Sequence, residues 1–469
     1  MTAAARCVLG RIAAGVDWAP PGGSGSDQLE IKDGPAAIAS ALPISDIAAG
    51  AYGALALAAA ALHAGRGGGA LRPFIDRRRA GLAMVGNEYL AVNGAAPESW
   101  DPLTGYYRCA DGWLYLHANF PHLRDGLLAF FGAEATRAAL GRRLQGWSAA
   151  EAEEKAQARG LCVMRLRAPT EWEAHPQRAA LGALPLIAMR SGGHAAPRRP
   201  RAGALPLSGF RVLDLSRVIA GPMAGRALSE LGADVLRISG PHLPFVEPLL
   251  IDTGFGKRNA HIDLRDEAGR DTLRALIKDA DVMIDAYRPG ALAARGFGPV
   301  EARALNPGLV HIGISAFGAV GPWAGRRGYD SYVQAGAGFT AQTGPGATPV
   351  RLACQPLDYL TGCLGAFAAV IGLIRRADGA GVAASLSLAR TAIWLREMAE
   401  ALGPDPSPPA RNPSRDEVEA EGALFGTESD FGAVRALAPP YGFNDAPLRL
   451  APPRRLGADT PAWLQELPS

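Results

Sequence analysis

The fold is decided by residues 210–238, which read FRVLDLSRVIAGPMAGRALSELGADVLRI. The stretch opens with a short apolar run, FRVLDL, and a Gly/Pro turn at Ala220-Gly221-Pro222 follows it. Residues Met223–Leu231 have helical spacing, and Gly232 stands just after them, where glycine commonly ends a helix. A second apolar run, DVLRI, completes the stretch. Strand, helix and strand in this order predict two parallel strands joined by a right-handed crossover.

Further strand-like runs follow at His261–Leu264, Asp281–Tyr287 and Leu309–Ser315, and a helix over Ala268–Lys278 separates two of them. Strands that alternate with helices predict a Rossmann-like α/β domain with a doubly wound parallel sheet. The turn SRVIAGPMAG does not contain G-x-G-x-x-G, which is the main sequence evidence for a dinucleotide-binding site, so the sequence does not favour NAD binding. The helix that begins in this turn still offers free backbone N–H groups to an anion.

The composition is typical of a folded protein with two or three domains, since the 469 residues are 48% hydrophobic. A net charge of +3 argues against a dedicated nucleic-acid binder. Five cysteines without CxxC or metal-ligand spacing predict reduced thiols and no metal site. The longest apolar runs, Ile47–Leu62 and Tyr359–Ile374, are shorter than a membrane span, and the N-terminus lacks the apolar core of a signal peptide. We therefore expect a cytoplasmic protein that does not enter a membrane.

Two proline-rich stretches divide the chain. Residues 194–207 read HAAPRRPRAGALPL, and residues 403–430 begin with GPDPSPPARNPSRDEVEAE. We interpret both as linkers, which leaves residues 1–193, residues 208–402 and a tail at residues 431–469 as the units of the chain.

The chain also contains an internal repeat at an offset of 312 residues. The segment DIAAGAYGALA at residues 46–56 matches DYLTGCLGAFA at residues 358–368, with five identical positions that include Asp46 and Asp358. Duplication explains the aspartate that both segments share at the start of an apolar helix. Chance similarity between two alanine-rich helices is the alternative.

Several motifs follow one another through residues 208–400. They are Val212–Pro222, Leu231–Arg237, Lys257–Leu264, Ala280–Gly290, Asn306–Val310, Ser315–Gly318, Gly321-Pro322, Gly328–Asp330 and Asp358–Gly362. In this order they resemble the class III CoA-transferase family, also called CaiB/BaiF, which includes formyl-CoA transferase. The resemblance implies the fold of that family, in which a smaller α+β domain accompanies the Rossmann-like domain.

Residues before the first linker resemble the later part of the same fold. Tyr106–Leu116 resembles the strand pair that opens the small α+β domain, and Trp147–Pro176 resembles its helix and following strand. Residues 431–469 resemble the C-terminal tail that packs on the large domain. The resemblance therefore implies a fused and partly duplicated chain, with a truncated copy at residues 1–193 and a CoA-binding copy at residues 208–402. It also implies a homodimer, because members of the family form interlocked dimers.

Asp358 stands where the family has its catalytic aspartate. The resemblance implies transfer of CoA from an acyl-CoA to a carboxylic acid, through an aspartyl anhydride and then an aspartyl-CoA thioester. A carboxylate suits this role because its anhydride and its thioester are both reactive. Without the family, an aspartate before a helix is interpreted as an N-cap. Asp46 has no nucleotide-binding half before it, so we interpret it as a cap and a remnant.

CoA carries phosphates, so cations near the turn after the first strand are candidate contacts. We predict phosphate contacts from Lys257, Arg258 and Arg288, with Arg217 and the turn Ala220-Gly221-Pro222 beside them. Solvated surface charge is the alternative for each of these cations. CoA is expected as a substrate, and no tightly bound cofactor is expected.

The sequence departs from the family pattern at three points. Ile219 and Ser239 replace a polar and an acidic residue, and the glycine-rich loop that covers the nucleophile has no clear counterpart. Two other functions stay open. A 2-methylacyl-CoA racemase needs a His/Asp pair, and Tyr329 precedes Asp330 where the racemases tend to have histidine. A non-catalytic CoA-binding protein would explain the partial duplication and the missing loop.

Overall fold

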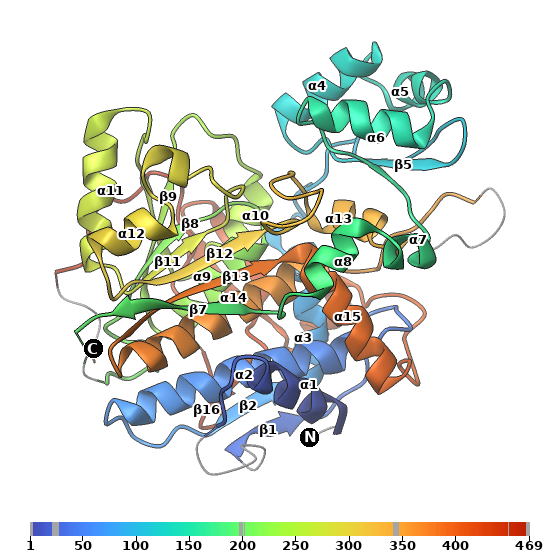
Figure 1. Ribbon diagram of the computed structural model, residues 1–469. Coiled ribbons are helices and arrows are strands. Elements are labelled where there is room, and N and C mark those ends of the chain that lie inside the picture. The colour runs from blue at the N-terminus through green and yellow to red at the C-terminus, as the bar shows by residue number, and fades with distance from the viewer. Residues whose placement is uncertain are drawn as a thin grey trace.

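The computed structural model describes residues 3–20, 28–196, 200, 202–340, 347–448 and 450–465. Within the predicted linker 194–207, residues 197–199 and 201 lie outside the described residues. Figure 1 shows a large α/β unit, a layer of N-terminal helices beside it, and a small unit that stands apart and contains α4, α5 and α6.

Seven strands form one sheet in the order β10-β9-β8-β11-β12-β13-β7. Neighbouring strands are parallel, except that β7 runs antiparallel to β13. Their bounds are Lys257–His261 (β10), Asp234–Ser239 (β9), Arg211–Leu215 (β8), Val282–Asp285 (β11), Val310–Ser315 (β12), Ala380–Ser387 (β13) and Ala188–His194 (β7). The chain builds outward from β8 in both directions, so a switch point lies between β8 and β11, where doubly wound sheets bind ligands. The predicted doubly wound α/β fold is confirmed.

Helices cover both faces of this sheet (Figure 1). Along β8 the side chains alternate, so that Val212 packs in the core shared with α9 and α14, and Leu213 packs against α11. These helices are α9 (Ala220–Glu230), α14 (Pro356–Arg376) and α11 (Glu267–Asp279), with α12 (Pro299–Leu305) beside α11. Short elements α10 (Glu247–Asp252), η3 (Ala293–Arg295) and α13 (Asp330–Gly336) connect the layers.

Two predicted elements have different bounds. The predicted turn Ala220-Gly221-Pro222 is the first turn of α9, where proline is tolerated because its missing N–H would have no partner within the helix. Strand β10 begins at Lys257 rather than at His261. Its polar side chains hid this strand from a hydrophobic pattern, because Lys257 and Asn259 are buried with partners of their own.

The N-terminal region repeats part of the large unit. Its elements are α1 (Ala3–Ala14), β1 (Glu30–Lys32), α2 (Ile44–Gly65), β2 (Pro73–Asp76) and α3 (Arg77–Leu82). Strands β1 and β2 are parallel, as β12 and β13 are, and α2 packs against both α1 and α14. A Cβ on Gly50 would lie 2.7 Å from the Ala5 carbonyl oxygen, and one on Gly362 would lie 2.6 Å from that of Ala220. The α1–α2 contact thus has the same close approach as the α9–α14 contact, which supports duplication.

The small unit is an α+β domain, as predicted. Strands β4 (Gly105–Arg108), β5 (Trp113–Leu116) and β6 (Val163–Arg165) form an antiparallel sheet, and α4 (Pro121–Phe131), α5 (Arg137–Leu144) and α6 (Ala149–Ala158) accompany it. Its core is a separate cluster that includes Leu114, Leu127 and Leu140. From β6 the chain continues through α7 (Pro169–Glu173) and α8 (Pro176–Gly182) to β7 at the edge of the large sheet.

The C-terminal part returns to both earlier regions. After α15 (Leu388–Leu402) and α16 (Arg415–Ala420), β14 (Leu424–Ser429) and β15 (Gly432–Leu437) form a sheet with β3 (Ala91–Val92), which follows η2 (Ala83–Tyr89). Strands β16 (Tyr441–Phe443) and β17 (Ala446–Pro447) extend the β1–β2 sheet. In the tail, Asp459 accepts the Asn259 N–H, and the Trp463 indole donates to the Leu276 carbonyl oxygen. The tail therefore lies against the large unit.

Helices α2 and α14 are longer than the apolar runs within them. They have 22 and 21 residues, and by length and composition alone they could cross a membrane. In the described structure 83% of the most apolar window of α2 and 94% of that of α14 are buried. Both are central helices of the hydrophobic core.

Candidate active site

Asp358 is the third residue of α14, and its side chain does not cap the helix. Gln355 occupies the cap position without a side-chain cap. Instead Asp330 Oδ2, at the start of α13, accepts the backbone N–H groups of Leu357 at 2.7 Å and of Asp358 at 2.9 Å. Asp330 therefore caps the start of α14, and the carboxylate of Asp358 is not needed for capping.

The environment of Asp358 disfavours its ionised form. The residue is 5% exposed, and no described side chain donates a hydrogen bond to its carboxylate. The backbone N–H of Asp330 does interact with this carboxylate and lowers its pKa, but by less than burial raises it. Burial raises the pKa of Asp358 well above its usual value, and the charge of Asp330 raises it further. Burial also raises the pKa of Asp330, to about 6. An ionised Asp358 is therefore poorly solvated, which makes it a reactive group.

A cavity of about 480 Å³ opens from Asp358 along the switch point between β8 and β11. Four arginines line it: Arg217, Arg288, Arg326 and Arg327. Asp358 is the sole carboxylate among the described residues that line it. Burial lowers the pKa values of Arg217 and Arg326. The cavity therefore has a surplus of positive charge along its walls and one acidic group beside it.

The start of α9 forms one wall of this cavity through Ala220 and Gly221. A Cβ on Gly221 would lie 2.4 Å from the Cβ of Ser216 and 2.6 Å from that of Ala286. Only glycine permits the first turn of α9 to come so close to the ends of β8 and β11. This approach brings the N-terminal end of a helix, with its partial positive charge, to the cavity wall.

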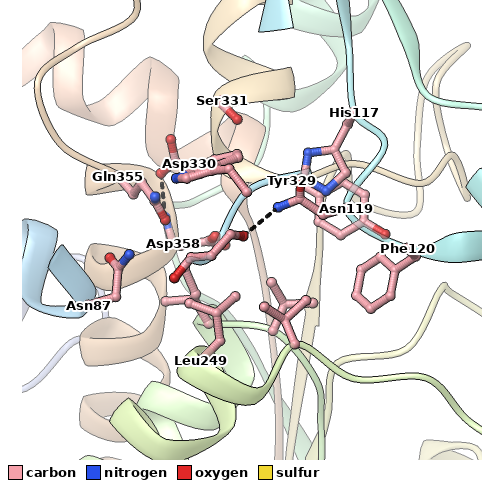
Figure 2. A pocket seen from close by; sticks show the side chains of 15 residues that line it. Asn87, His117, Asn119, Phe120, Leu249, Tyr329, Asp330, Ser331, Gln355 and Asp358 are labelled. Atoms are coloured by element: carbon pink, nitrogen blue, oxygen red, sulfur yellow. Dashed lines mark hydrogen bonds between the residues drawn. The ribbon is translucent and has the colours of Figure 1, made fainter. Parts of the chain in front are cut away.

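A second, narrower pocket of about 20 Å³ adjoins Asp358 on its other side. Its walls include Asn87, Trp100, His117, Asn119 and Phe120, all from the region before the first linker (Figure 2). Phe120 and Asp358 line both spaces. Asp358 therefore lies at the junction of a wide charged cavity and a narrow pocket, and residues from both predicted copies build the site within one chain.

The family model described as CoA-transferase family III matches residues 15–202 and 207–441. The chain belongs to this family. The match covers the small domain, the doubly wound sheet and Asp358. The division between its two segments falls within the predicted linker at residues 194–207.

Relatives with printed functions match this family III chain over part of their length. The acetyl-coenzyme A transferase nodX of Hypoxylon pulicicidum is 36% identical, over 39% of this chain and 32% of that protein. The succinate–glutarate CoA-transferase of Agrobacterium fabrum is 34% identical, over 41% of this chain and 54% of that protein. The crystal structure of Rv3272 from Mycobacterium tuberculosis is 32% identical, covers 42% of this chain and 57% of that one, and gives a TM-score of 0.40. The chain thus spans a third to about half of the length of these curated relatives.

The structure brings four of the predicted CoA contacts to the cavity of the family III chain and leaves three away from it. Arg217, Arg288, Ala220 and Gly221 line it. Pro222 belongs to the same helical turn, and its carbonyl oxygen accepts a hydrogen bond from the ammonium of Lys257 at 2.5 Å.

Lys257 and Arg258 are engaged inside the fold. The Lys257 ammonium is fully buried, 2.7 Å from Asp214 Oδ2, and burial lowers the pKa of Lys257 to about 8. Arg258 forms an ion pair with Asp234 at 2.9 Å and donates to the Ala462 carbonyl oxygen. Neither lines the cavity, so we withdraw both as phosphate contacts.

Asp46 is held by an ion pair and does not cap α2, contrary to our interpretation. Its two carboxylate oxygens accept hydrogen bonds from Arg77 at 2.9 and 2.6 Å, and α2 has no side-chain cap. The pair is buried, and Asp46 lines neither space beside Asp358. The remnant interpretation remains a prediction.

Sequence reasoning missed Arg326, Arg327 and the walls of the narrow pocket. The two arginines stand directly before the Gly328–Asp330 motif, which is a signal that could have identified them. Residues His117–Phe120 follow the predicted strand pair of the small domain. That position gave no indication that the small domain reaches Asp358, which lies more than two hundred residues later in the chain.

Proposed function

We propose that this chain transfers coenzyme A from an acyl-CoA donor to a free carboxylic acid, with Asp358 as the nucleophile. The observation that carries the proposal is the cavity of about 480 Å³, with four arginines on its walls and Asp358 as the sole carboxylate among its described lining residues. An acyl-CoA has phosphates at one end and an electrophilic thioester at the other. The charge of its phosphates therefore complements the arginines of the cavity, and the thioester would lie next to Asp358.

Each step of the proposed reaction forms one bond and breaks another. A carboxylate oxygen of Asp358 attacks the thioester carbonyl carbon, the carbon–sulfur bond breaks, and CoA thiolate leaves a mixed anhydride. The thiolate then attacks the aspartyl carbonyl carbon, which releases the donor acid and forms an aspartyl-CoA thioester. The acceptor carboxylate attacks the aspartyl carbonyl carbon of this thioester, the carbon–sulfur bond breaks, and CoA thiolate leaves a second anhydride. Finally, CoA thiolate attacks the acceptor acyl carbon, which forms the new acyl-CoA and regenerates Asp358.

The surroundings of Asp358 support its role as a nucleophile. No described side chain donates a hydrogen bond to its carboxylate, so no side-chain partner has to be displaced before it attacks. The raised pKa of Asp358 makes its ionised form a stronger nucleophile than a solvated carboxylate. Arg217 and Arg327 line the same cavity and would hold the CoA phosphates. The proposal needs no tightly bound cofactor, because CoA enters and leaves as part of the substrates.

The test is to trap the covalent intermediate. The full chain is incubated with an acyl-CoA, treated with hydroxylamine or borohydride, and digested for peptide mass spectrometry. The modification is expected on Asp358, and Asp358→Asn should lose both the modification and the transfer of CoA. The matched control is Asp46→Asn, which changes the equivalent residue of the repeat and should keep transfer once its folding is verified by its melting temperature.

Two results would contradict the proposal. Full transfer by Asp358→Asn would exclude this residue as the nucleophile. Binding of CoA by calorimetry, without turnover across a broad set of acyl-CoA donors and acids, would support a non-catalytic CoA-binding protein instead.

A further inference from the structure

The narrow pocket contains a histidine that the proposed chemistry does not use. His117 follows β5, is 4% exposed, and has neither ring nitrogen hydrogen-bonded in the described structure. It is the one histidine among the described residues with both ring nitrogens buried and without a partner. Burial of polar atoms without partners is unfavourable, and such groups call for a functional explanation.

The ring of His117 is held in place by aromatic neighbours. It stacks on Tyr329, with ring centroids 3.8 Å apart and an angle of 16° between the planes. Trp100 meets it edge-on, with centroids 6.3 Å apart. Figure 2 shows the imidazole over Tyr329 at the wall of the pocket that Asp358 also lines. Both ring nitrogens are buried by this packing without a hydrogen-bond partner in the described structure, so a bound molecule reaches them when the walls of the pocket move.

The pocket around His117 is polar but contains no cation. Besides His117, its neutral polar residues are Asn87, Ser99, Asn119, Ser331 and Gln355, and its acidic residues are Asp330 and Asp358. No lysine or arginine is among its described lining residues. Arg351 lies behind the wall, 5.2 Å from the ring of Trp100, and pairs with Glu88. A second carboxylate on the substrate would meet two acidic groups here and no positive charge to balance it.

The protonation state of His117 agrees with this picture. Burial lowers the pKa of His117 to about 3, so the ring is neutral near pH 7. A neutral imidazole offers one N–H donor and one nitrogen acceptor. A hydroxyl group can likewise donate and accept, so it matches the ring better than a carboxylate does.

We propose that the narrow pocket receives the acyl group of the donor, and that His117 selects a short acyl chain with an uncharged hydrogen-bonding substituent such as a hydroxyl. This inference rests on the proposed function, because it places the thioester at Asp358, where the wide cavity and the narrow pocket meet. A volume of about 20 Å³ holds about one water molecule, so the walls must move to admit an acyl group, and only a short chain is accommodated.

The test compares three donors of similar size: 3-hydroxybutyryl-CoA, butyryl-CoA and succinyl-CoA. Transfer to one fixed acceptor acid is measured as kcat/KM, and binding of each donor to the full chain is measured separately by calorimetry. We expect 3-hydroxybutyryl-CoA to exceed butyryl-CoA by roughly tenfold, which one hydrogen bond accounts for, and succinyl-CoA to be the poorest of the three. His117→Phe keeps a ring to stack on Tyr329 and should lower kcat/KM for the hydroxyl donor more than for butyryl-CoA, which removes the advantage of the hydroxyl donor. His117→Gln should restore part of that advantage.

The outcomes separate this inference from the proposed function. Equal binding of the three donors, or a preference for succinyl-CoA, overturns the role of the pocket even if transfer and trapping at Asp358 succeed. An equal loss for all donors in His117→Phe shows a structural role and also overturns it. If transfer fails with every donor, the proposed function fails, and the binding preference by calorimetry still decides the role of His117. Uptake of deuterium at the α-carbon that depends on His117 would assign the ring to proton transfer and overturn the inference.

Discussion

The charge of Asp330 adds to burial in raising the pKa of Asp358, so replacing Asp330 with asparagine should shift the acid limb of the pH profile to lower pH. Asp330 Oδ2 accepts the backbone N–H groups of Leu357 and Asp358 at the start of α14. After burial, its negative charge is the next cause that raises the pKa of Asp358. Asparagine keeps an acceptor oxygen for the two N–H groups and removes the charge, so the pKa of Asp358 should fall.

The size of the shift follows from the interaction of the two charges. At an effective dielectric constant of about 20, two unit charges about 4 Å apart interact by about 4 kcal/mol, and the interaction weakens in proportion to their separation. One pKa unit corresponds to about 1.4 kcal/mol, so removing the charge of Asp330 should lower the pKa of Asp358 by an amount that a pH profile can resolve. Because the nucleophile works only when ionised, activity is lost as the pH falls through this pKa, and the limb should move down by the same amount. Burial raises the pKa of Asp330 to about 6, so the effect is full above that pH and shrinks below it.

The assay is kcat/KM for the acyl-CoA donor from about pH 5 to about pH 9. The matched control is Asp285→Asn, since burial also raises the pKa of Asp285 to about 6, but this residue lines a different cavity from Asp358. That variant should keep the wild-type limb. A limb that stays in place in Asp330→Asn, or moves to higher pH, would refute the coupling, provided the melting temperature shows that the variant is folded.

Three other substitutions test the rest of the site. Arg327→Ala removes a cation from the cavity and should raise KM for acyl-CoA by roughly tenfold. The control Arg258→Ala should not change KM, because Arg258 is paired with Asp234. Equal steady-state KM values for the two variants would contradict the assignment of Arg327. Lys257→Met breaks a fully buried ion pair and should lower the free energy of unfolding by about 3–5 kcal/mol in chemical denaturation; a loss under about 1 kcal/mol would contradict this. Gly221→Ala places a Cβ within 2.4 Å of Ser216 and should lower both the melting temperature and the rate of transfer, and an unchanged rate would show that the start of α9 is not critical.

Local sequence patterns were sufficient to predict most of the strands and helices of the large unit. The apolar runs and the glycine that follows the predicted helix indicated β8, α9 and β9, and the predicted helix Ala268–Lys278 lies within α11. Strand β10 was misplaced because two of its inward side chains are polar and buried with partners that are far away in the sequence. A hydrophobic pattern has no means of detecting a buried lysine that is paired with an aspartate 43 residues earlier.

The candidate site was predictable only where its residues belong to motifs. Asp358, Arg217, Arg288 and Gly221 stand in segments that resemble the family, and they meet at one cavity. The motifs also contain Lys257 and Arg258, which form ion pairs within the fold. A sequence motif does not show which of its cations are paired with a carboxylate elsewhere in the chain. The narrow pocket forms only where the small domain, which contributes His117, packs against the region that contains Asp358. No local sequence pattern predicts this tertiary contact.

The two aspartates of the repeat have the same local structure, but their surroundings give them different roles. Asp46 and Asp358 are each the third residue of a long apolar helix, and a glycine four residues later lets another helix approach closely in both cases. Asp46 faces Arg77, which occupies both of its oxygens and holds them as a structural pair. Asp358 faces a cavity and lies next to a second carboxyl group, and no described cation forms an ion pair with it. A partner for the carboxylate, rather than the helix that carries it, therefore decides which copy can act as a nucleophile.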